Sequence, residues 1–577
     1  MTPRPRAARP PDPAATHLFM ESDSLQPSMG SRLASALDLE GEEEIGIGIL
    51  ALLTSAIHDA HPQIPLSRVF HEISQAGAAS LLDPLTVLPL LLPRKDPSAK
   101  DILALIGECC PAKEVIIAVQ EAIEQLEISY DKDEEDENGD DDDTALNDLS
   151  RPGQLVTLVE VYSSCIPRLK LRRKTASETI SPLLLELESA IQLSGPRATR
   201  EEGRNLVITI SVLVNRVKAW AMATSNVGSD VILACNVALK SVMDCTLVAC
   251  EHCIESSLTQ RSFETFFPRL VVRSALQPGW EGGKEAVSSA IAAYSELLVA
   301  DSSLLSAPST SSMIVFAHSE LDSIVPDHLS KIIPILIASI QTGSALDEAL
   351  TIILHGLEPR TRPRPILPEE VIFPLFSVLP PLSCTHPDSL VRHQAYRILS
   401  LLLSSCPSQL RLTLLSELVS YPGYPQMCVG AIGLVKEAVL EGIANPPSIF
   451  ASPLFLAVLG SVIFRASPPD LFANPDLTLE EFKNSSEPAR LVECLGLYYI
   501  LLKRDESNMT QIRDPALLSR IENTWLYPMR MTLSRWAENN GQSSEDDLHD
   551  MLPLVSLQMG LERVDAAKSE LLDPQWS

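Results

Sequence analysis

Residues 387–443 read PDSLVRHQAYRILSLLLSSCPSQLRLTLLSELVSYPGYPQMCVGAIGLVKEAVLEGI, and this stretch contains the clearest helical repeat of the chain. Apolar residues recur in it at the three- and four-residue spacing of a helix that buries one face. In the first segment they are Val391, Ala395, Ile398, Leu399 and Leu402, with Asp388 before them as a cap. A Cys-Pro break at 406–407 and a Pro-Gly break at 422–423 separate two further segments of the same kind. Helices joined by such short turns pack antiparallel, so the stretch predicts three stacked helices.

The same helical pattern extends in both directions from this stretch. Apolar-periodic segments of roughly 12 to 20 residues alternate with breaks containing Pro, Gly or Ser, up to a last helix over about 552–572. The arrangement that begins at Asp388, Asp-x-x-Val-Arg-x-x-x-Ala, resembles the start of the inner helix of a HEAT repeat. No single period covers the whole chain. The sequence therefore predicts an all-α fold, an irregular HEAT/armadillo-like α-solenoid of stacked antiparallel helices.

Composition along the chain suggests three regions. Residues 1–35 are rich in Pro and Arg and are expected to be a disordered tail. Residues 36–300 are expected to form an N-terminal helical repeat region, interrupted by a disordered acidic insert at 131–143, DKDEEDENGDDDD. That insert is either a solvated loop or a tail that attracts basic partners. Residues 301–577 are expected to form a C-terminal HEAT-like region that binds a partner.

The charge of the 577-residue chain narrows the classes of partner. Its net charge is −30, which repels phosphate backbones and anionic lipid headgroups, so we expect neither nucleic-acid nor membrane binding. Basic protein surfaces complement such a charge, although acidity also keeps an apolar chain in solution. The eleven cysteines show no repeating spacing and no signal peptide precedes them. We therefore expect reduced thiols in a monomeric protein of the cytoplasm or nucleus.

Motifs that could carry chemistry are few. Residues 46–51, GIGILA, match a dinucleotide fingerprint by letter, but three glutamates at 42–44 precede them and would repel a phosphate. The densest group of soft ligands is Cys245, Cys250, His252 and Cys253. It could bind zinc or act as a redox pair, but no second pair at zinc spacing accompanies it, which favours buried helix thiols. We expect no enzyme activity, no cofactor and no metal.

Four motifs carry a resemblance to a known family. They occupy residues 406–418, 429–436 (VGAIGLVK), 495–508 (LGLYYILLKRDESN) and 518–528 (LSRIENTWLYP). Taken together, residues 397–536 resemble the C-terminal half of the glomulin family. This family also includes the plant aberrant-lateral-root-formation protein and, more distantly, fungal Yap-binding and kinetochore proteins.

The resemblance implies a non-enzymatic HEAT-type solenoid. In glomulin and its plant relative, the C-terminal part grips the RING domain of the RING-box subunit of cullin–RING ubiquitin ligases. It covers the face that recruits the ubiquitin-conjugating enzyme, so ligase activity falls. By implication, residues 390–577 would bind such a partner here. Two alternatives stay open: a fungal Yap-binding or kinetochore-type adaptor in oxidative stress or chromosome segregation, and a HEAT-repeat assembly chaperone.

The candidate partner-binding residues lie in the last two motifs and just after them. Aromatic and arginine side chains anchor interfaces, which nominates Tyr499, Trp525, Tyr527 and Arg530 as exposed contacts. Four polar residues either lock the helix junction or face the partner: Arg504, Asp505, Glu522 and Asn523. Helical spacing assigns Ile521, Leu526 and Leu533 to the core.

Overall fold

The computed structural model describes most of the chain. The described residues are 42–59, 61–135, 148–224, 229–271, 275–297, 304–319, 321, 324–357, 366–420, 423–474, 476–539 and 552–572. The chain divides into two compact units, Met1–Lys174 and Thr175–Ser577, so the boundary expected at 300/301 falls inside the second unit. The expected tail at 1–35 and residues 136–143 of the acidic insert lie outside the described residues.

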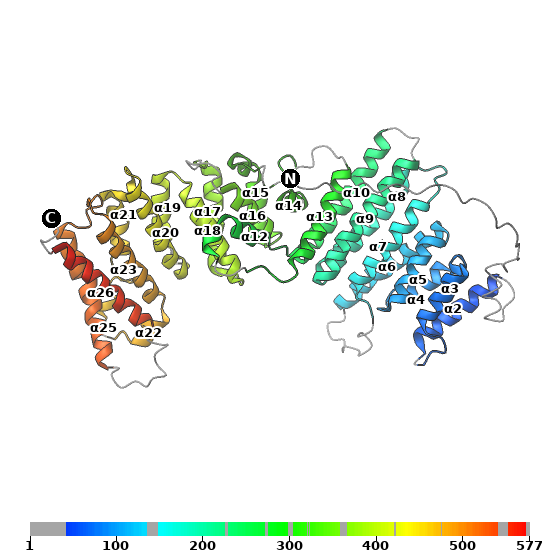
Figure 1. The fold of residues 1–577 in the computed structure, drawn as a ribbon, viewed down its shortest axis with the longest axis horizontal. Coiled ribbons are helices and arrows are strands. Elements are labelled where there is room, and N and C mark those ends of the chain that lie inside the picture. Colours follow the sequence, from blue (N-terminus) through cyan, green and yellow to red (C-terminus); the bar gives the residue numbers. More distant parts are fainter. Residues whose placement is uncertain are drawn as a thin grey trace, which may run out of the picture. The chain divides into compact units, whose positions relative to one another are not determined.

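The prediction of an all-α helical repeat fold is confirmed. The described residues form helices and turns, with one isolated β-bridge between Arg94 and Asp148. Within each unit, consecutive helices lie side by side (Figure 1). Each helix buries an apolar stripe on its neighbours, as expected for a solenoid.

Six α-helices build the described part of the first unit. They are α2 (Glu42–His58), α3 (Leu66–Ala76), α4 (Pro84–Leu91), α5 (Pro97–Cys109), α6 (Ala112–Glu135) and α7 (Arg151–Cys165). The side chains of Asp83 and Asp96 cap α4 and α5, and each aspartate is followed by a proline that has no N–H to satisfy. Helix α7 packs on both α5 and α6. Residues 131–135, the first part of the acidic insert, continue α6 as helix.

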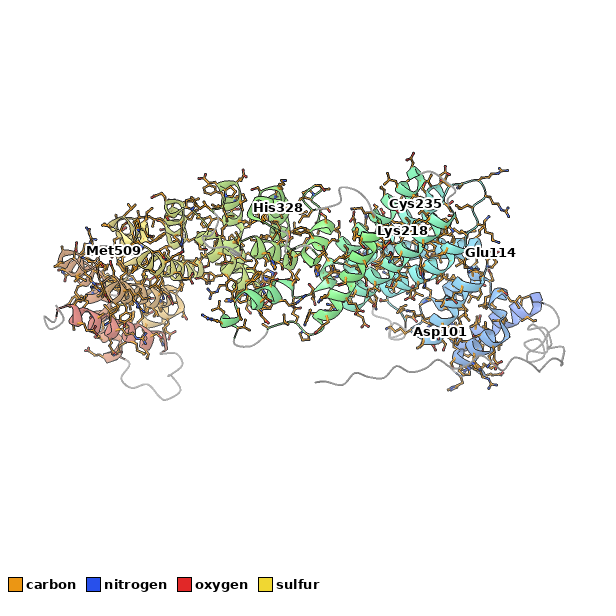
Figure 2. The ribbon with its side chains drawn as sticks, turned by 45° about the horizontal axis from the view of Figure 1, so that its top comes forward. Asp101, Glu114, Lys218, Cys235, His328 and Met509 are labelled. Carbon is orange, nitrogen blue, oxygen red and sulfur yellow. The ribbon has the colours of Figure 1, made fainter. Side chains whose placement is uncertain are left out.

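The second unit begins with a stack of eleven described α-helices. They are α8 (Ala176–Ser194), α9 (Arg200–Thr224), α10 (Ser229–Ala249), α11 (Glu251–Ile254), α12 (Leu258–Phe266), α13 (Trp280–Leu297), α14 (Thr310–Ser319), α15 (Pro326–Thr342), α16 (Leu346–Leu357), α17 (Glu369–Thr385) and α18 (Ser389–Ser404). Helix α10 packs on α8 and α9, and α9 packs on α13. Lys218 of α9, labelled in Figure 2, pairs with Glu296 of α13 at 3.0 Å.

Two helices of this stack are long and apolar enough to cross a membrane by length and composition alone. They span Arg200–Thr224 and Asp230–Ala249. Both pack against neighbouring helices of the same unit, and core helices of this kind meet the same criterion.

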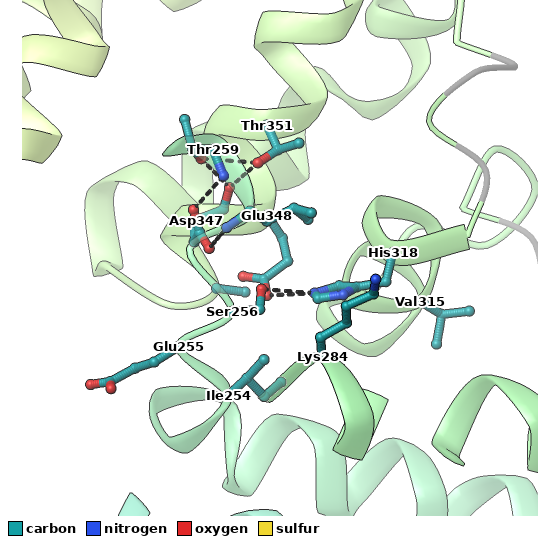
Figure 3. Close-up of polar contacts among 12 residues, drawn as sticks. Ile254, Glu255, Ser256, Thr259, Lys284, Val315, His318, Asp347, Glu348 and Thr351 are labelled. Carbon is teal, nitrogen blue, oxygen red and sulfur yellow. Dashed lines mark hydrogen bonds and ion pairs between the residues drawn. The ribbon is translucent and has the colours of Figure 1, made fainter. Parts of the chain in front are cut away.

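A buried polar cluster joins α12, α14 and α16 (Figure 3). Asp347, at the start of α16, accepts hydrogen bonds from the backbone N–H groups of Leu258 (2.6 Å) and Thr259 (2.8 Å). Asp347 thereby caps α12, whose own preceding residue does not provide a side-chain cap. Beside it, His318 Nε2 lies 3.2 Å from Glu348 Oε1, and both side chains are buried. Burial, followed by the charge of Glu348, raises the pKa of Asp347.

The second unit ends with eight more described α-helices. They are α19 (Ser408–Ser420), α20 (Pro425–Ala444), α21 (Pro453–Ile463), α22 (Leu479–Asn484), α23 (Glu487–Arg504), α24 (Pro515–Ile521), α25 (Tyr527–Asn539) and α26 (Leu552–Leu572). Helices α18, α19 and α20 are the three helices predicted from residues 387–443. The Asp388 side chain caps α18, as its position indicated.

The Gly-x-x-Gly element of residues 429–436 has a packing role. The Tyr396 hydroxyl donates a hydrogen bond to the Gly430 carbonyl at 2.9 Å. A Cβ atom at Gly430 would lie 3.0 Å from the Tyr396 ring, and one at Gly433 would lie 3.2 Å from its hydroxyl. Glycine at these two positions therefore lets α18 and α20 meet around Tyr396.

Candidate functional site

Helix α23 is the framework of the candidate site. Its apolar stripe, at the three- and four-residue spacing of a core-facing helix, is buried at Leu491, Cys494, Leu495, Tyr498 and Leu502. One side of the helix packs on α20 and another on α26. Packing against α20 and α26 therefore fixes the position of α23, including the polar turn at its C-terminus.

A buried ion pair anchors the start of α23. Arg490 Nε lies 2.6 Å from Glu487 Oε2, and Arg490 Nη2 lies 2.7 Å from Glu487 Oε1. Arg490 Nη2 also donates to the Arg465 carbonyl at 2.5 Å, and the Ser467 N–H donates to Glu487 at 2.9 Å. Burial alone would lower the pKa of Arg490, but the hydrogen bonds to Glu487 raise it, so the guanidinium stays charged.

The polar segment after α23 is organised by Asp505, which is 0% exposed. Its carboxylate accepts hydrogen bonds from the N–H of Met509 (2.8 Å), the N–H of Thr510 (2.8 Å) and the Thr510 hydroxyl (2.6 Å). Arg513 donates to the Leu502 carbonyl at 2.7 Å. The Asp505 carboxylate therefore holds the loop between α23 and α24 in place, because its hydrogen-bond partners Met509 and Thr510 both lie in that loop.

Asn508 closes the same segment. It has a left-handed φ of 49°, which asparagine tolerates better than most residues. Its side-chain amide donates to Asp514 at 2.8 Å and accepts from the Arg513 N–H at 2.9 Å. Asp514 stands at the N-cap of α24, so the loop delivers the chain directly into the next helix.

A wide turn of π-helix at Glu522–Leu526 joins α24 to α25. The N–H of Tyr527 donates to the Glu522 carbonyl, five residues back instead of four. Pro528 explains the change, because it has no N–H and its ring would clash with the carbonyl four residues earlier. The string Ile-Glu-Asn-Thr-Trp-Leu-Tyr-Pro therefore encodes a widened turn.

The expectation that Trp525 is exposed is wrong. Its side chain is 0% exposed, with ring centroids 5.8 Å from Phe464 and 6.3 Å from Tyr498. Trp525 follows the buried Ile521 by four residues, so both lie on the core face of the turn. That spacing was visible in the sequence and outweighs the preference of tryptophan for interfaces.

Glu522 and Arg530 belong to an ionic network that holds α26. Glu522 pairs with Arg530 and with Lys568 of α26. Arg530 also pairs with Asp565 of α26 at 2.6 Å. The α26 partners were missed from the sequence, because opposite charges more than thirty residues apart give no local pairing signal.

The remaining candidates differ in exposure. Arg504 and Asn523 are exposed, Tyr499 is half-buried, and Tyr527 is 57% exposed on α25. One helical turn beyond Tyr527, Met531 is 54% exposed, and it was not predicted. Tyr527 and Met531 form an exposed apolar pair, which we call the α25 patch.

Comparison with known protein families gives a match over the C-terminal helices. Residues 316–564 match the model of a family described as "Uncharacterised protein family, YAP/Alf4/glomulin". Over those residues, which are less than half of the chain, the protein is similar to the YAP/Alf4/glomulin family. The matched region runs from α14 into α26 and includes every candidate residue. None of the curated proteins matches the chain.

The YAP/Alf4/glomulin family is not a known enzyme family, and its members suggest protein-binding adaptors. In this chain, burial raises the pKa of Cys250 to about 12 and that of Cys253 to about 11. At neutral pH both are protonated thiols, which are poor nucleophiles and poor metal ligands. Among the described residues, no three His, Cys, Asp or Glu side chains come together as a metal site would require.

The docking of α26 on the rest of the C-terminal helices is expected to weaken in acid. Burial would raise the pKa of Glu522, but the hydrogen bonds from Arg530 and Lys568 lower it below its ordinary 4.5. A lowered carboxyl pKa contributes stability above the ordinary value, and this stability is lost as pH falls through the folded pKa. Hydrogen exchange of the α26 amides, corrected for intrinsic rates, should therefore accelerate below about pH 4.

Glu522→Gln should remove most of this acid sensitivity while loosening α26 at neutral pH. Glu538→Gln, an exposed carboxylate on α25, serves as the matched control. Equal acid sensitivity of α26 in the wild-type and Glu522→Gln proteins would contradict the assignment.

Proposed function

We propose that this protein is a non-enzymatic regulator that binds the RING-box subunit of cullin–RING ubiquitin ligases. Its C-terminal helices would cover the RING face that recruits the ubiquitin-conjugating enzyme, so that ubiquitin transfer falls by steric competition. The observation that carries the proposal is the family match over residues 316–564, which takes in α23 to α25 and most of α26. We place the activity in the cytoplasm or nucleus, where the free cysteines would stay reduced.

The geometry of the C-terminal helices supports a binding role. Asp505 and the Glu522–Arg530 network keep the backbone of α23 to α26 in one arrangement, so little order has to be gained on binding. On this rigid base the α25 patch exposes a tyrosine and a methionine, two residue types enriched in interfaces. The net charge of −30 favours encounter with basic partner surfaces.

Replacing the α25 patch tests the proposal at residue level. Tyr527→Ala with Met531→Ala should weaken binding to a RING-box protein in complex with a cullin by about 30-fold or more, as expected for interface anchors. Binding of the full chain can be measured by interferometry at low salt. The matched control is Leu185→Ala, which truncates an apolar side chain that is 69% exposed on α8.

The double variant should keep the wild-type helicity, because both side chains are exposed. Undiminished binding by the double variant would move the interface away from α25. Absence of binding by the wild-type chain at micromolar concentration would contradict the proposed partner itself.

A second candidate function draws on the same family description, which names YAP beside glomulin. The helical scaffold would then hold a stress-response transcription factor or a kinetochore complex. Proximity labelling that recovers such proteins without cullin subunits would favour this adaptor role over ligase inhibition.

A further inference from the structure

A groove separates α21 from α24 and the loop before it. It has a volume of about 660 Å³, within the range of roughly 300–1,000 Å³ that is common for ligand sites. The α21 wall presents Leu456, Ala457 and Gly460, and the opposite wall presents Ala516, Leu517 and Arg520. We call it the α21–α24 groove. It does not include the α25 patch.

Helix α21 leaves an apolar face uncovered along this groove. Its sequence, PLFLAVLGSVI, contains no charged residue. Phe455, Leu459 and Ile463 are buried, and the helix packs on α19. In contrast, Ala457, which lines the groove, is exposed, and Leu454, which is outside the groove lining, is 44% exposed. A helix that is apolar all round is normally covered on every side, so the open face of α21 suits a partner segment.

The wall formed by α24 and the loop before it is held in place by hydrogen bonds within the chain. Thr510 lines the groove and is held by two hydrogen bonds to the buried Asp505 carboxylate. Asp514, at the N-cap of α24, accepts a hydrogen bond from the Asn508 amide at 2.8 Å. A preformed wall means that a bound segment would not have to order the loop, which favours affinity.

The charge of the groove is opposite to that of the chain. Arg465 and Arg520 are exposed on its two walls, and no described carboxylate lies within ion-pair distance of either guanidinium. Among the described residues, Asp514 is the only carboxylate that lines the groove, and it accepts a hydrogen bond from Asn508. Two unpaired arginines in a chain of net charge −30 leave a local excess of positive charge beside an apolar surface.

The carboxylates next to Arg465 are also engaged. Glu481 and Glu487 lie with Arg465 around a neighbouring hollow. Glu487 is paired with Arg490, and Glu481 accepts from the Thr478 N–H at 3.1 Å in a capping box. Neither carboxylate therefore neutralises Arg465 directly, so an acidic group of a partner can pair with it.

We propose that the α21–α24 groove binds an amphipathic helical segment of a partner protein whose apolar stripe is flanked by Asp or Glu. Its leucine-type side chains would enter beside Ala457 and Gly460, and its carboxylates would pair with Arg465 and Arg520. This is the helix-in-groove mode of peptide recognition. The groove prefers an acidic partner, whereas the acidic surface as a whole attracts basic ones, so the inference does not rest on the proposed function.

The test uses the full chain and a fluorescent synthetic helical peptide with leucines at i, i+3, i+4 and i+7 flanked by glutamates. A second peptide carries lysines in place of the glutamates. By fluorescence anisotropy at low salt, the glutamate peptide should bind about tenfold tighter or more, and added salt should reduce the difference. Equal binding of both peptides, tighter binding of the lysine peptide, or no binding of either would overturn the proposal.

Two variants locate the binding in the groove. At Gly460 a Cβ would meet nothing closer than 3.7 Å, so Gly460→Leu fills the groove without a clash and replaces a helix glycine. It should weaken the glutamate peptide about tenfold or more. Arg465→Glu with Arg520→Glu should invert the peptide preference, while Arg535→Glu, exposed on α25 and outside the groove, should not.

Wild-type binding in Gly460→Leu, or an unchanged peptide preference in the double arginine variant, would contradict the assignment. None of these variants alters the α25 patch, so each should bind a RING-box protein as the wild type does. Failure of the wild-type chain to bind a RING-box protein, while it still prefers the glutamate peptide, would count against the proposed function and not against the groove.

Discussion

Replacing Arg490 by methionine should lower the free energy of opening at the start of α23 by about 3–5 kcal/mol. Methionine fills a similar volume but leaves the Glu487 carboxylate buried without its cation, because the pair is bidentate and both side chains are almost fully covered. The Arg465 carbonyl also loses its donor. Hydrogen exchange of the α23 amides in the full chain measures the opening free energy directly.

The double variant Glu487→Gln with Arg490→Met separates charge from packing. Glutamine keeps an acceptor for the Ser467 N–H but carries no charge, so much of the lost stability should return. If the double variant opens as readily as Arg490→Met alone, lost packing and not the unpaired carboxylate explains the effect. An unchanged exchange rate of the α23 amides in Arg490→Met would show that the Glu487–Arg490 pair contributes little to the stability of α23.

The second large effect is expected at Trp525. Trp525→Ala should destabilise the junction of α24 and α25 by about 3–5 kcal/mol, because it empties the space beside Phe464 and Tyr498. Exchange of the α23 and α25 amides should accelerate together, since the aromatic cluster joins these elements.

Tyr527→Ala is the matched control for Trp525→Ala. It removes another aromatic ring only two residues away, but that ring is exposed, so the expected change is within about 0.5 kcal/mol. Similar effects of the two substitutions would contradict the burial pattern of the π turn.

Much of the C-terminal fold could be predicted because it depends on local patterns. The apolar spacing and the two proline breaks of residues 387–443 specify α18 to α20. The last helix, expected at about 552–572, is α26 (Leu552–Leu572). Helical periodicity and breakers are properties of neighbouring residues, so one sequence suffices to read them.

The roles of the polar residues could not be predicted, because they depend on residues that meet only in the fold. Asp505 was one of four residues that could lock the junction or face a partner, and its burial with Thr510 assigns it to the junction. Glu522 is divided between Arg530 and Lys568, of which the second lies on another helix. Arg504 and Asn523 remain exposed and are available to a partner.

The motifs that carry the family resemblance thus encode a rigid platform more than a set of contacts. A buried carboxylate holds the loop after α23, a proline widens the turn after α24, and an ionic network holds α26. We expect contact residues to lie among the exposed side chains that this platform presents, such as Tyr527 and Met531.

The most direct test of the proposed function is a discharge assay with a reconstituted cullin–RING ligase. Purified full chain is added to the ligase and a ubiquitin-charged conjugating enzyme, and release of ubiquitin is followed over time. We predict that the chain slows discharge in a concentration-dependent way, that excess conjugating enzyme relieves the inhibition, and that Tyr527→Ala with Met531→Ala weakens it. Discharge at an unchanged rate with saturating wild-type chain would contradict the proposed function.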